Sequence, residues 1–294
     1  MFYVINYAEG EPYESLRKVN TKSAYLFGKA DKVLEYSSTD IPHSYKEQHK
    51  DIFAYKRGAG LWLWKPYIIS DALGKINDGD WLLYLDSGIT VIRDIHYLIN
   101  NAKSNNTSIF IMEQPLLNRQ FTKRECFIKM GIEDEDNNQV LGLLLLLRKS
   151  EESIHFVQEW LHKCEDVELL SPEHFHPEIS EWKDYYSHRE DQSILSLLRI
   201  KYKLPTFRDC SDYGKFPFQY ANPKYAYNPK VYDNSNYPTV ILCNRKAKPY
   251  AYFIKYCLKV IANKVHYYTE EKVLKKRGII RYIRQQIYAD TNFR

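Results

Sequence analysis

The sequence lacks the hallmarks of several large classes of protein. Its five cysteines are odd in number and none has Cys-x-x-Cys spacing, which argues against a disulfide framework or a structural zinc site. The longest apolar run, residues 140–147, is interrupted by Gly142 and is too short to span a bilayer. Residues 1–7 are too short and too uncharged for a signal peptide. We therefore expect a reduced, cytoplasmic protein, soluble or peripheral to the inner face of the cytoplasmic membrane.

A strong excess of one charge is also missing. The chain carries 42 basic and 37 acidic side chains, and the mild net charge of +5 does not by itself indicate a nucleic-acid partner. Internal repeats and low-complexity tracts are absent. A length of 294 residues and a hydrophobic content of 44% are enough for one large domain with a full core and an appendage. The 26 tyrosines suit carbohydrate and nucleotide faces, although such rings also pack ordinary cores.

Apolar patterning predicts strands that alternate with helices. The expected strands are residues 3–6, 32–36, 81–85, 109–112 and 140–148. The expected helices are residues 14–28, 45–58, 65–73, 95–101, 153–163 and 192–200. This alternation indicates an α/β fold with a mostly parallel sheet. The segment 205–249, rich in Tyr, Asn and Pro, is expected to be an ordered loop with short strands.

The carboxy-terminal tail differs from the rest of the chain in charge. Residues 255–294 hold ten basic and three acidic side chains, a net charge of +7. An apolar stripe is expected on this basic helix, made by Ile279, Ile280, Tyr282, Ile283 and Ile287. Such a helix can lie on an anionic membrane surface or pack on its own domain. We therefore expect a domain of residues 1–250 and a basic helical extension of residues 251–294.

One aspartate follows a strongly apolar strand. Residues 81–85 run directly into Asp86, and Gly88 then allows the chain to turn. In open α/β sheets, ligands bind beyond the carboxyl ends of the strands. A carboxylate at that place can hold a metal ion, a ribose hydroxyl or a sugar hydroxyl, or it can simply cap the turn.

A second segment, residues 57–66, combines cations, glycines and tryptophans at a helix start. Glycine lets the backbone approach a ligand, and a helix amino terminus favours anions, so that Arg57 and Lys65 can neutralise a diphosphate. The segment matches neither the Walker loop nor the Gly-x-Gly-x-x-Gly fingerprint. It can also be a turn with two core tryptophans, one of them Trp64.

Two further polar groups stand beside expected elements. The run His188, Arg189, Glu190, Asp191 and Gln192 begins an amphipathic helix. Acidic residues in a first turn often only cap the helix, but five polar groups in a row exceed that need. They can bind sugar hydroxyls or stabilise charge at an anomeric carbon.

Glu113 follows the expected strand 109–112. It would therefore lie at the same edge of the sheet as Asp86.

In this order, the motifs resemble those of a known family. A Gly-x-Gly-x-Trp-x-Trp-Lys-Pro turn (58–66) precedes a Tyr-Leu-Asp-Ser-Gly strand end (84–88). A glycine-containing apolar strand (141–147) and a His-Arg-x-Asp-Gln run (188–192) follow. Over residues 1–200 the chain is similar to bacterial GT-A-fold glycosyltransferases, which are typical of capsule, lipopolysaccharide and other surface-glycan gene clusters.

The resemblance implies a fold and a reaction. The fold is a GT-A-like, Rossmann-type mixed sheet flanked by helices. The reaction is transfer of a sugar from a nucleotide-diphosphate donor to a hydroxyl of a surface-glycan acceptor, in the manner of a hexosyltransferase and with retention of configuration.

The resemblance also assigns residues to the donor. Asp86 takes the place of the Asp-x-Asp motif and would anchor the diphosphate, directly or through Mn²⁺ or Mg²⁺. Glycine, Gly88, stands here in place of the second carboxylate, so that Arg57, Lys65 or another cation would balance the charge if no metal is bound. Asp191, with Gln192, would face the donor sugar and stabilise oxocarbenium-like charge.

The remaining site residues are expected around that donor. Asn6 and Tyr7 would lie near the base and the ribose, and Glu113 would contact the acceptor or act as a base. Substrate contacts are expected from Trp64, His188, Arg189 and Gln192. The loop 216–237 would cover the acceptor.

Other classes of protein share parts of this pattern. A sugar nucleotidyl or phosphoryl transferase would share the Asp at the sheet edge and the basic groups. A glycoside hydrolase would also use paired carboxylates, but it is more often exported. A non-enzymatic protein that binds glycans or nucleic acids through its basic, tyrosine-rich tail would leave Asp86 and Asp191 without a role.

Overall fold

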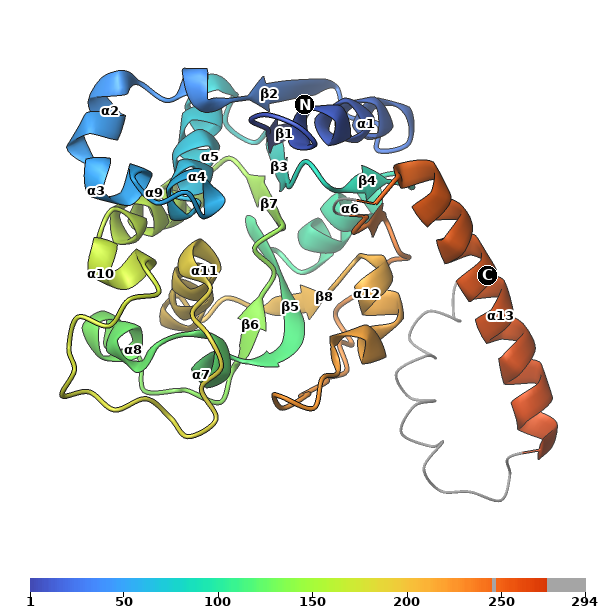
Figure 1. The fold of residues 1–294 in the computed structure, drawn as a ribbon. Helices are drawn as coiled ribbons and strands as arrows, with labels where there is room; N and C mark the ends of the chain where they lie inside the picture. Colours follow the sequence, from blue (N-terminus) through green and yellow to red (C-terminus); the bar gives the residue numbers. More distant parts are fainter. Residues whose placement is uncertain (245–246, 274–294) are drawn as a thin grey trace.

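The computed structural model describes residues 1–244 and 247–273 (Figure 1). Within this part, seven strands form one sheet in the order β2-β1-β3-β7-β5-β6, with β8 paired to β5. Their bounds are β1 (Phe2–Tyr7), β2 (Lys32–Tyr36), β3 (Trp81–Leu85), β5 (Ile109–Leu117), β6 (Asn138–Val140), β7 (Leu144–Arg148) and β8 (Thr206–Arg208). A separate pair joins β4 (Thr90–Val91) to β9 (Ile241–Leu242).

The strand directions decide where the ends of the strands meet. β1 is parallel to β2 and β3, and β5 is parallel to β8. β7 runs antiparallel to both β3 and β5, so β3 and β5 point the same way. The carboxyl ends of β1, β3, β5 and β8 therefore lie along one edge of the sheet, which we call the carboxyl edge. The structure confirms the expected mixed α/β sheet flanked by helices.

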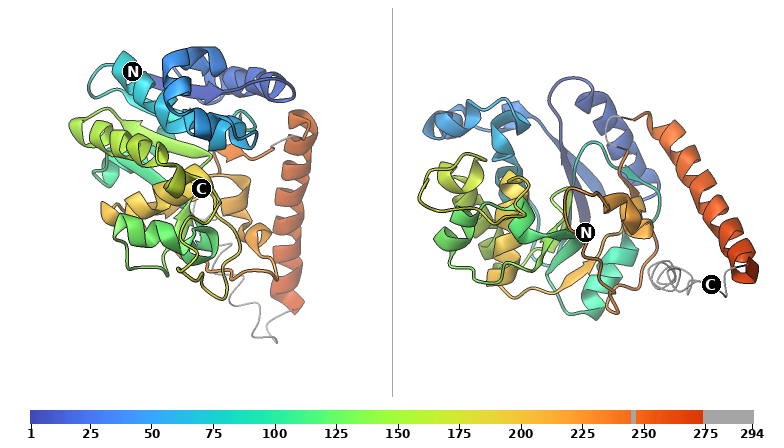
Figure 2. Two further views of the ribbon diagram at one scale, coloured as in Figure 1. Left: turned by 60° about the vertical axis from the view of Figure 1, so that its left-hand side comes forward. Right: turned by 60° about the horizontal axis from the view of Figure 1, so that its bottom comes forward.

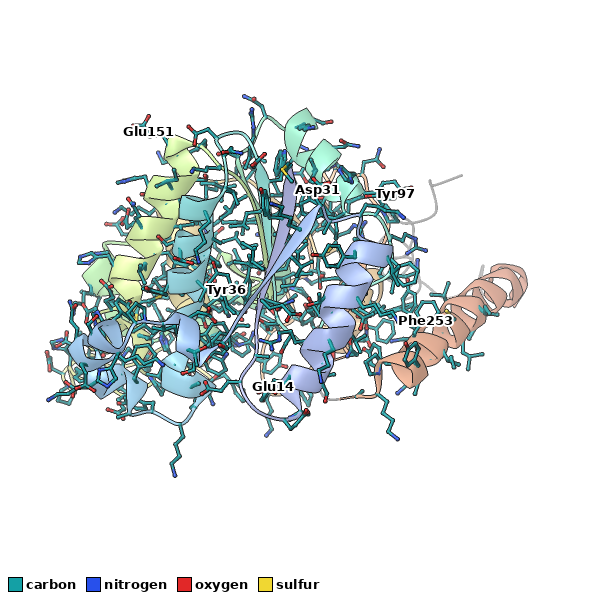
Figure 3. All side chains as sticks on the ribbon, turned by 90° about the horizontal axis from the view of Figure 1, so that it is seen from above. Glu14, Asp31, Tyr36, Tyr97, Glu151 and Phe253 are labelled. Carbon is teal, nitrogen blue, oxygen red and sulfur yellow. The ribbon has the colours of Figure 1, made fainter. Side chains whose placement is uncertain are left out.

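Helices cover both faces of the sheet. One face carries α1 (Tyr13–Leu26) and α6 (His96–Ser104), and the other carries α5 (Trp64–Lys75), α9 (Glu151–Cys164) and α11 (Glu190–Lys201). Figure 3 shows α1 and α9 on opposite sides of the strands. The remaining helices are α2 (His43–Gln48), α3 (Lys50–Phe53), α4 (Gly58–Leu61), α7 (Asn118–Phe121), α8 (Arg124–Met130), α10 (Val167–Leu170), α12 (Asp212–Lys215) and α13 (Pro249–Val273), with 3₁₀ turns at Ser38–Asp40 and Pro217–Tyr220.

The central strand β3 explains why its sequence is apolar throughout. Leu82 and Tyr84 face the core under α5, α9 and α11, whereas Trp81, Leu83 and Leu85 face the core under α1 and α6. A strand that is buried on both faces shows a continuous apolar run instead of alternation.

Three expected elements differ from the observed ones. The single helix expected over 45–58 is broken at His49, whose backbone is not helical, and gives α2, α3 and then a glycine-rich turn. The expected strand 109–112 continues to Leu117 because β6 pairs with its second half. The expected strand 140–148 is divided around Gly142 into β6 and β7.

The helix α13 lies along one side of the molecule (Figures 1 and 2). Tyr256 packs it against Phe216 and Leu242. Apolar side chains on its outer surface stay exposed: Tyr250, Phe253, Ile254, Leu258 and Ile261. The expected stripe from Ile279 to Ile287 lies outside the described residues, and the division at residue 250 stays a prediction. Within the described ranges, no helix has the length and apolar character needed to cross a membrane.

Candidate functional site

Asp86 lies at the carboxyl edge, directly after β3. The phenol of Tyr84 donates a hydrogen bond to Asp86 Oδ1 at 2.5 Å. Burial and the nearby charge of Asp86 raise the pKa of Tyr84, so the phenol keeps its proton. The turn itself is closed by the backbone, because Ile89 N donates to Asp86 O at 3.0 Å. Asn20 of α1 holds the same loop through hydrogen bonds to Asp86 O and Ile89 O. The half-buried carboxylate is therefore not needed as a cap.

A buried ion pair stands beside Asp86. Lys65, in the first turn of α5, donates to Asp191 Oδ2 at 2.7 Å and to Gly142 O at 3.0 Å. Both side chains of the pair are 5% exposed. The indole of Trp160 on α9 donates to Asp191 O at 3.1 Å and so fixes the start of α11. We call Lys65, Tyr84, Asp86 and Asp191 the acid–lysine cluster.

The charges of this cluster influence one another. Burial raises the pKa of Asp191 to about 6, although Lys65 opposes the shift; the charge of Asp86 adds to it. Burial acts to lower the pKa of Lys65, but the charges of Asp191 and Asp86 outweigh it and raise the pKa. The ammonium of Lys65 therefore remains charged; it is paired with Asp191 and also feels the charge of Asp86.

Gly142 lies where a side chain would press against Gln192 of α11. A Cβ at this position would lie 3.0 Å from Gln192 Cβ and 3.2 Å from its Cγ. Gln192 Nε2 in turn donates to Gln139 Oε1 at 2.9 Å. The glycine that interrupts the apolar run thus lets α11 approach the sheet and presents its carbonyl to Lys65.

The segment after Arg57 forms a left-handed turn, residues 58–62, in which every φ is positive, from +50° to +93°. Non-glycine residues adopt this conformation at a cost of roughly 1–2 kcal/mol each. Interactions on both sides hold it in place. Arg57 Nε donates to Glu190 Oε1 at 2.6 Å, and Trp64 Nε1 donates to Gly58 O at 2.8 Å. Glu190 itself has a φ of +40°. Strain of this kind gathers at functional sites.

Replacing Gly60 with alanine should show what the left-handed turn demands. The added Cβ would lie 2.7 Å from Phe53 Cδ1, at a φ of +93°. We expect the free energy of unfolding to fall by about 1–3 kcal/mol, measured by urea denaturation. Gly74→Ala in α5 is the matched control, because its Cβ meets nothing within 4 Å, and it should be neutral or stabilising. Equal losses in both variants would contradict this account.

Asn6 and Tyr7 lie at the end of β1, on the same edge as Asp86. Asn6 is fully buried and donates to Asn20 Oδ1 at 2.9 Å. Tyr7 stacks on the indole of Trp64 at 3.9 Å between ring centres. Both residues lie at the edge where the contact with a nucleotide is expected. The side chain of Asn6 is completely buried, whereas Tyr7 is slightly exposed.

His188 has a different environment from the expected one. It is 2% exposed, accepts from Lys123 N at Nδ1, and has Nε2 3.0 Å from Leu169 O. Burial, with the charge of Lys123, lowers its pKa to about 3, so the ring is neutral. Backbone groups at both ring nitrogens favour a structural role over the expected contact with substrate. Arg189 places its guanidinium 4.0 Å from the ring centre of Phe121.

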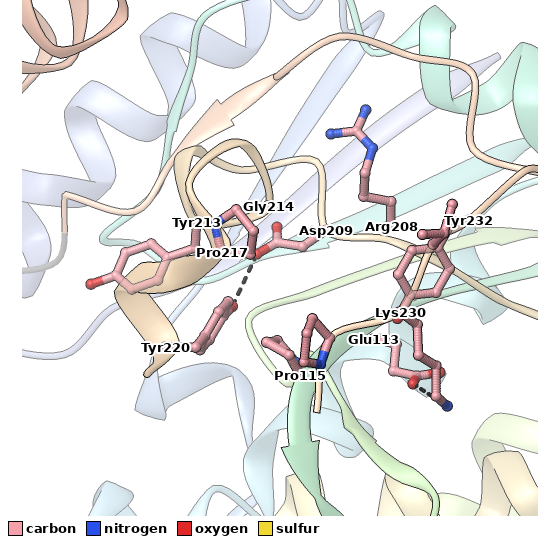
Figure 4. Close-up of a pocket in the computed structure, with 12 residues that line it drawn as sticks. Glu113, Pro115, Arg208, Asp209, Tyr213, Gly214, Pro217, Tyr220, Lys230 and Tyr232 are labelled. Atoms are coloured by element: carbon pink, nitrogen blue, oxygen red, sulfur yellow. Dashed lines mark hydrogen bonds and ion pairs between the residues drawn. The ribbon is translucent and has the colours of Figure 1, made fainter. Parts of the chain in front are cut away.

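The sequence predicted Glu113 just beyond the end of a strand, but the residue lies inside β5. It remains at the carboxyl edge and is 2% exposed. Lys230 Nζ is 2.6 Å from Glu113 Oε1. Both residues line a pocket whose walls include Pro115, Asp209, Tyr220 and Tyr232, and we call it the Glu113 pocket (Figure 4). The loop expected to cover the acceptor supplies Tyr220, Lys230 and Tyr232.

Sequence reasoning missed Asp209 because β8 has only three residues. Asp209 follows β8 at the carboxyl edge, just as Asp86 follows β3. The signal was an aspartate after Phe207 and Arg208, but a run this short does not predict a strand.

The described residues do not form a complete metal site without a ligand. Across the described chain, no group of three or more His, Cys, Asp or Glu side chains can hold a metal ion. Asp86 Oδ1 already accepts from Tyr84, Asp191 is paired with Lys65, and glycine stands at position 88. Mg²⁺ needs one or two carboxylates in addition to phosphates. We therefore assign no step to Mn²⁺ or Mg²⁺ and consider Lys65 and Arg57 as the cations of the site.

Comparisons with known proteins give structural likenesses at low identity. No protein-family model and no curated protein sequence matches the chain. The galactosyltransferase LgtC, solved with donor and acceptor sugar analogues, matches with a TM-score of 0.44 at 15% identity, over 85% of this chain and 88% of its own.

Two further structures are similar at comparably low identity. Mouse xyloside xylosyltransferase 1 has a TM-score of 0.43 at 11% identity, over 83% of this chain and 98% of its own. The glycosyltransferase GlyE of Streptococcus pneumoniae has a TM-score of 0.36 at 18% identity, over 82% of this chain and 54% of its own. Likenesses below a TM-score of 0.5 carry no inference about the reaction, which therefore depends on the site itself.

Proposed function

We propose that the chain transfers a sugar from a nucleotide-diphosphate donor to a hydroxyl of a glycan acceptor. The acid–lysine cluster carries this proposal. It places a buried cation, paired with Asp191, near the carboxylate of Asp86 at the carboxyl edge, where ligands bind in open α/β sheets. A nucleotide sugar needs positive charge for its diphosphate and acceptor oxygens for its hydroxyls, and the cluster offers both.

Each residue of the cluster then has a separate task. The ammonium of Lys65 and the guanidinium of Arg57 supply positive charge toward the departing diphosphate. Asp86 accepts hydrogen bonds from hydroxyls of the donor. Asp191, in its ionised form, faces the sugar and stabilises the positive charge that develops at the anomeric carbon. Its position at the start of α11 is fixed by Lys65 and Trp160.

In the transfer itself, one bond replaces another at the anomeric carbon. The bond to the diphosphate oxygen breaks and the bond to the acceptor oxygen forms, while the acceptor's proton leaves with the diphosphate. Retention of configuration is part of the proposal because of the Asp191–Gln192 resemblance. Glu113, at the same edge, is proposed to contact the acceptor.

We further propose a surface glycan as the acceptor and the inner face of the cytoplasmic membrane as the place of work. The positive charge of the tail and the exposed apolar side chains of α13 support this proposal. The tail 255–294 has a net charge of +7, and the outer surface of α13 shows Phe253, Ile254 and Leu258 to solvent. Apolar side chains beside lysines suit an anionic lipid surface.

Product analysis tests the reaction class. The protein is incubated with UDP-, GDP-, CDP- and dTDP-hexoses, and the released nucleotide is identified by chromatography. Release of a nucleoside diphosphate from one of them is expected. A second incubation contains a sugar phosphate and a nucleoside triphosphate. Release of pyrophosphate in this incubation would instead identify a nucleotidyl transferase.

A further inference from the structure

The Glu113 pocket lies two strands away from the acid–lysine cluster, at the same edge of the sheet. Two of its carboxyl groups are almost completely buried, with Glu113 2% and Asp209 3% exposed. Pro115, Tyr220 and Tyr232 supply its apolar walls (Figure 4). Aromatic walls with buried carboxylates suit a polar ligand that also has an apolar face.

The two carboxyl groups differ in how they are satisfied. Asp209 accepts from Ser211 N at 2.7 Å and from the phenol of Tyr220 at 2.9 Å, and both donors are uncharged. Burial raises the pKa of Asp209. Glu113, in contrast, has Lys230 as its cation at 2.6 Å. Among the described residues, Glu113 is thus paired with a cation from the loop, and the Tyr232 phenol of the same loop is its uncharged hydrogen-bond partner.

Arg208 lies beside Glu113 in the pocket lining and contacts Tyr237. Its guanidinium donates to Tyr237 O and stacks 5.0 Å from the centre of the Tyr237 ring. Figure 4 shows it pointing away from Glu113 and Lys230. The cation in contact with Glu113 is Lys230, which lies in the irregular segment after the 3₁₀ turn Pro217–Tyr220 and has a side chain 39% exposed.

These facts set a condition on any ligand that enters next to Glu113. A buried carboxylate that loses its cation costs several kcal/mol, whereas an exposed lysine loses little when it returns to water. A neutral ligand that moved Lys230 aside would have to meet that cost. A ligand that brings its own ammonium group would restore the pair.

We propose that the Glu113 pocket binds a sugar with a free primary amine, whose ammonium takes the place of the Lys230 ammonium on Glu113. The assignment of this sugar as the acceptor rests on the proposed transfer reaction, but the preference of the pocket for an amine does not. In the free protein, Lys230 occupies the position of the ligand's ammonium and keeps Glu113 paired.

Binding in the absence of any donor tests this proposal. The probes are the trisaccharide of glucosamine and the trisaccharide of N-acetylglucosamine, which differ in their amine charge, titrated calorimetrically at 0.15 M salt. In Lys230→Met the competing ammonium is gone, so the glucosamine probe should bind at least tenfold more tightly than to the unchanged protein. Glu113→Gln should bind both probes equally. Lys224→Met, at an exposed lysine of the same loop, is the matched control and should behave as the unchanged protein.

The opposite results are equally clear. The proposal would be overturned if the two trisaccharides had equal affinities both for the unchanged protein and for Lys230→Met. It would also be overturned if neither protein bound either trisaccharide. Should Lys230→Met fail to fold, loss of the amine preference on going from the unchanged protein to Glu113→Gln decides the question. None of these measurements contains a nucleotide, so a negative result would not count against the proposed transfer reaction. In the same way, failure of the transfer reaction would not count against the binding of an amine in this pocket.

Discussion

Replacing Lys65 with methionine is expected to lower the free energy of unfolding by about 3–5 kcal/mol, because it leaves a buried carboxylate without its cation. Lys65 and Asp191 are each 5% exposed, and Lys65 also donates to Gly142 O. Methionine keeps the length and apolar stem of lysine, so the loss reports on the charge. Urea denaturation monitored by tryptophan fluorescence measures it.

Two further variants separate the buried pair from ordinary effects of lysine removal. Lys75→Met removes a lysine from the same helix, where the ion pair with Asp71 is partly exposed, and should cost less than about 1 kcal/mol. The double variant Lys65→Met, Asp191→Leu should recover most of the stability lost in the single variant, because neither charge is then buried alone. A loss in Lys65→Met no larger than that in Lys75→Met would contradict the buried pair.

The second large effect is expected on turnover. Asp191→Asn should lower the turnover number at least 100-fold, on the order of the effect of one preorganised group that stabilises transition-state charge. Binding of the nucleoside diphosphate should not weaken, since Asp191 is proposed to face the sugar and its replacement leaves the charge of Lys65 available to the phosphates. Steady-state kinetics and calorimetric titration of the diphosphate give the two numbers. Asp94→Asn, at an exposed surface ion pair, is the control and should leave both unchanged.

The pH profile adds a second readout for Asp191. Its pKa is raised to about 6, and only the ionised form can stabilise positive charge. Turnover should therefore rise between pH 5 and 7 and level off above, and this limb should be absent in the residual activity of Asp191→Asn. Loss of diphosphate binding as large as the loss of turnover would show that Asp191 acts on the whole donor or on the fold.

Much of the fold could be predicted because its signals are local. The run 81–85 is apolar throughout and became β3, and the helical spacing of Phe156, Val157 and Trp160 became α9. The cluster was also within reach, because Lys65, Asp86 and Asp191 each stand at the boundary of an expected element. Their meeting follows from topology, since β3, α5 and α11 end or begin at one edge.

The rest depended on contacts between distant segments. β5 continues past Met112 because residues 138–140 pair with it, and nothing near Glu113 signals that partner. The left-handed turn 58–62 is held by Glu190 and Trp64, so glycines alone predicted a turn but not its hand. His188 became a core residue because Lys123 N and Leu169 O meet its ring, which no spacing could predict.

The most direct test of the donor site is a thermal-shift measurement with UDP, GDP, CDP and dTDP, each with and without Mn²⁺, on the unchanged protein and on Asp86→Ala. A ligand present at 100 times its Kd stabilises the native state by about 2.7 kcal/mol and must raise the Tm. The account predicts that one of the four diphosphates raises the Tm without Mn²⁺ and that Asp86→Ala loses this shift. No shift with any of the four, with or without Mn²⁺, would contradict a nucleotide-diphosphate site at the carboxyl edge.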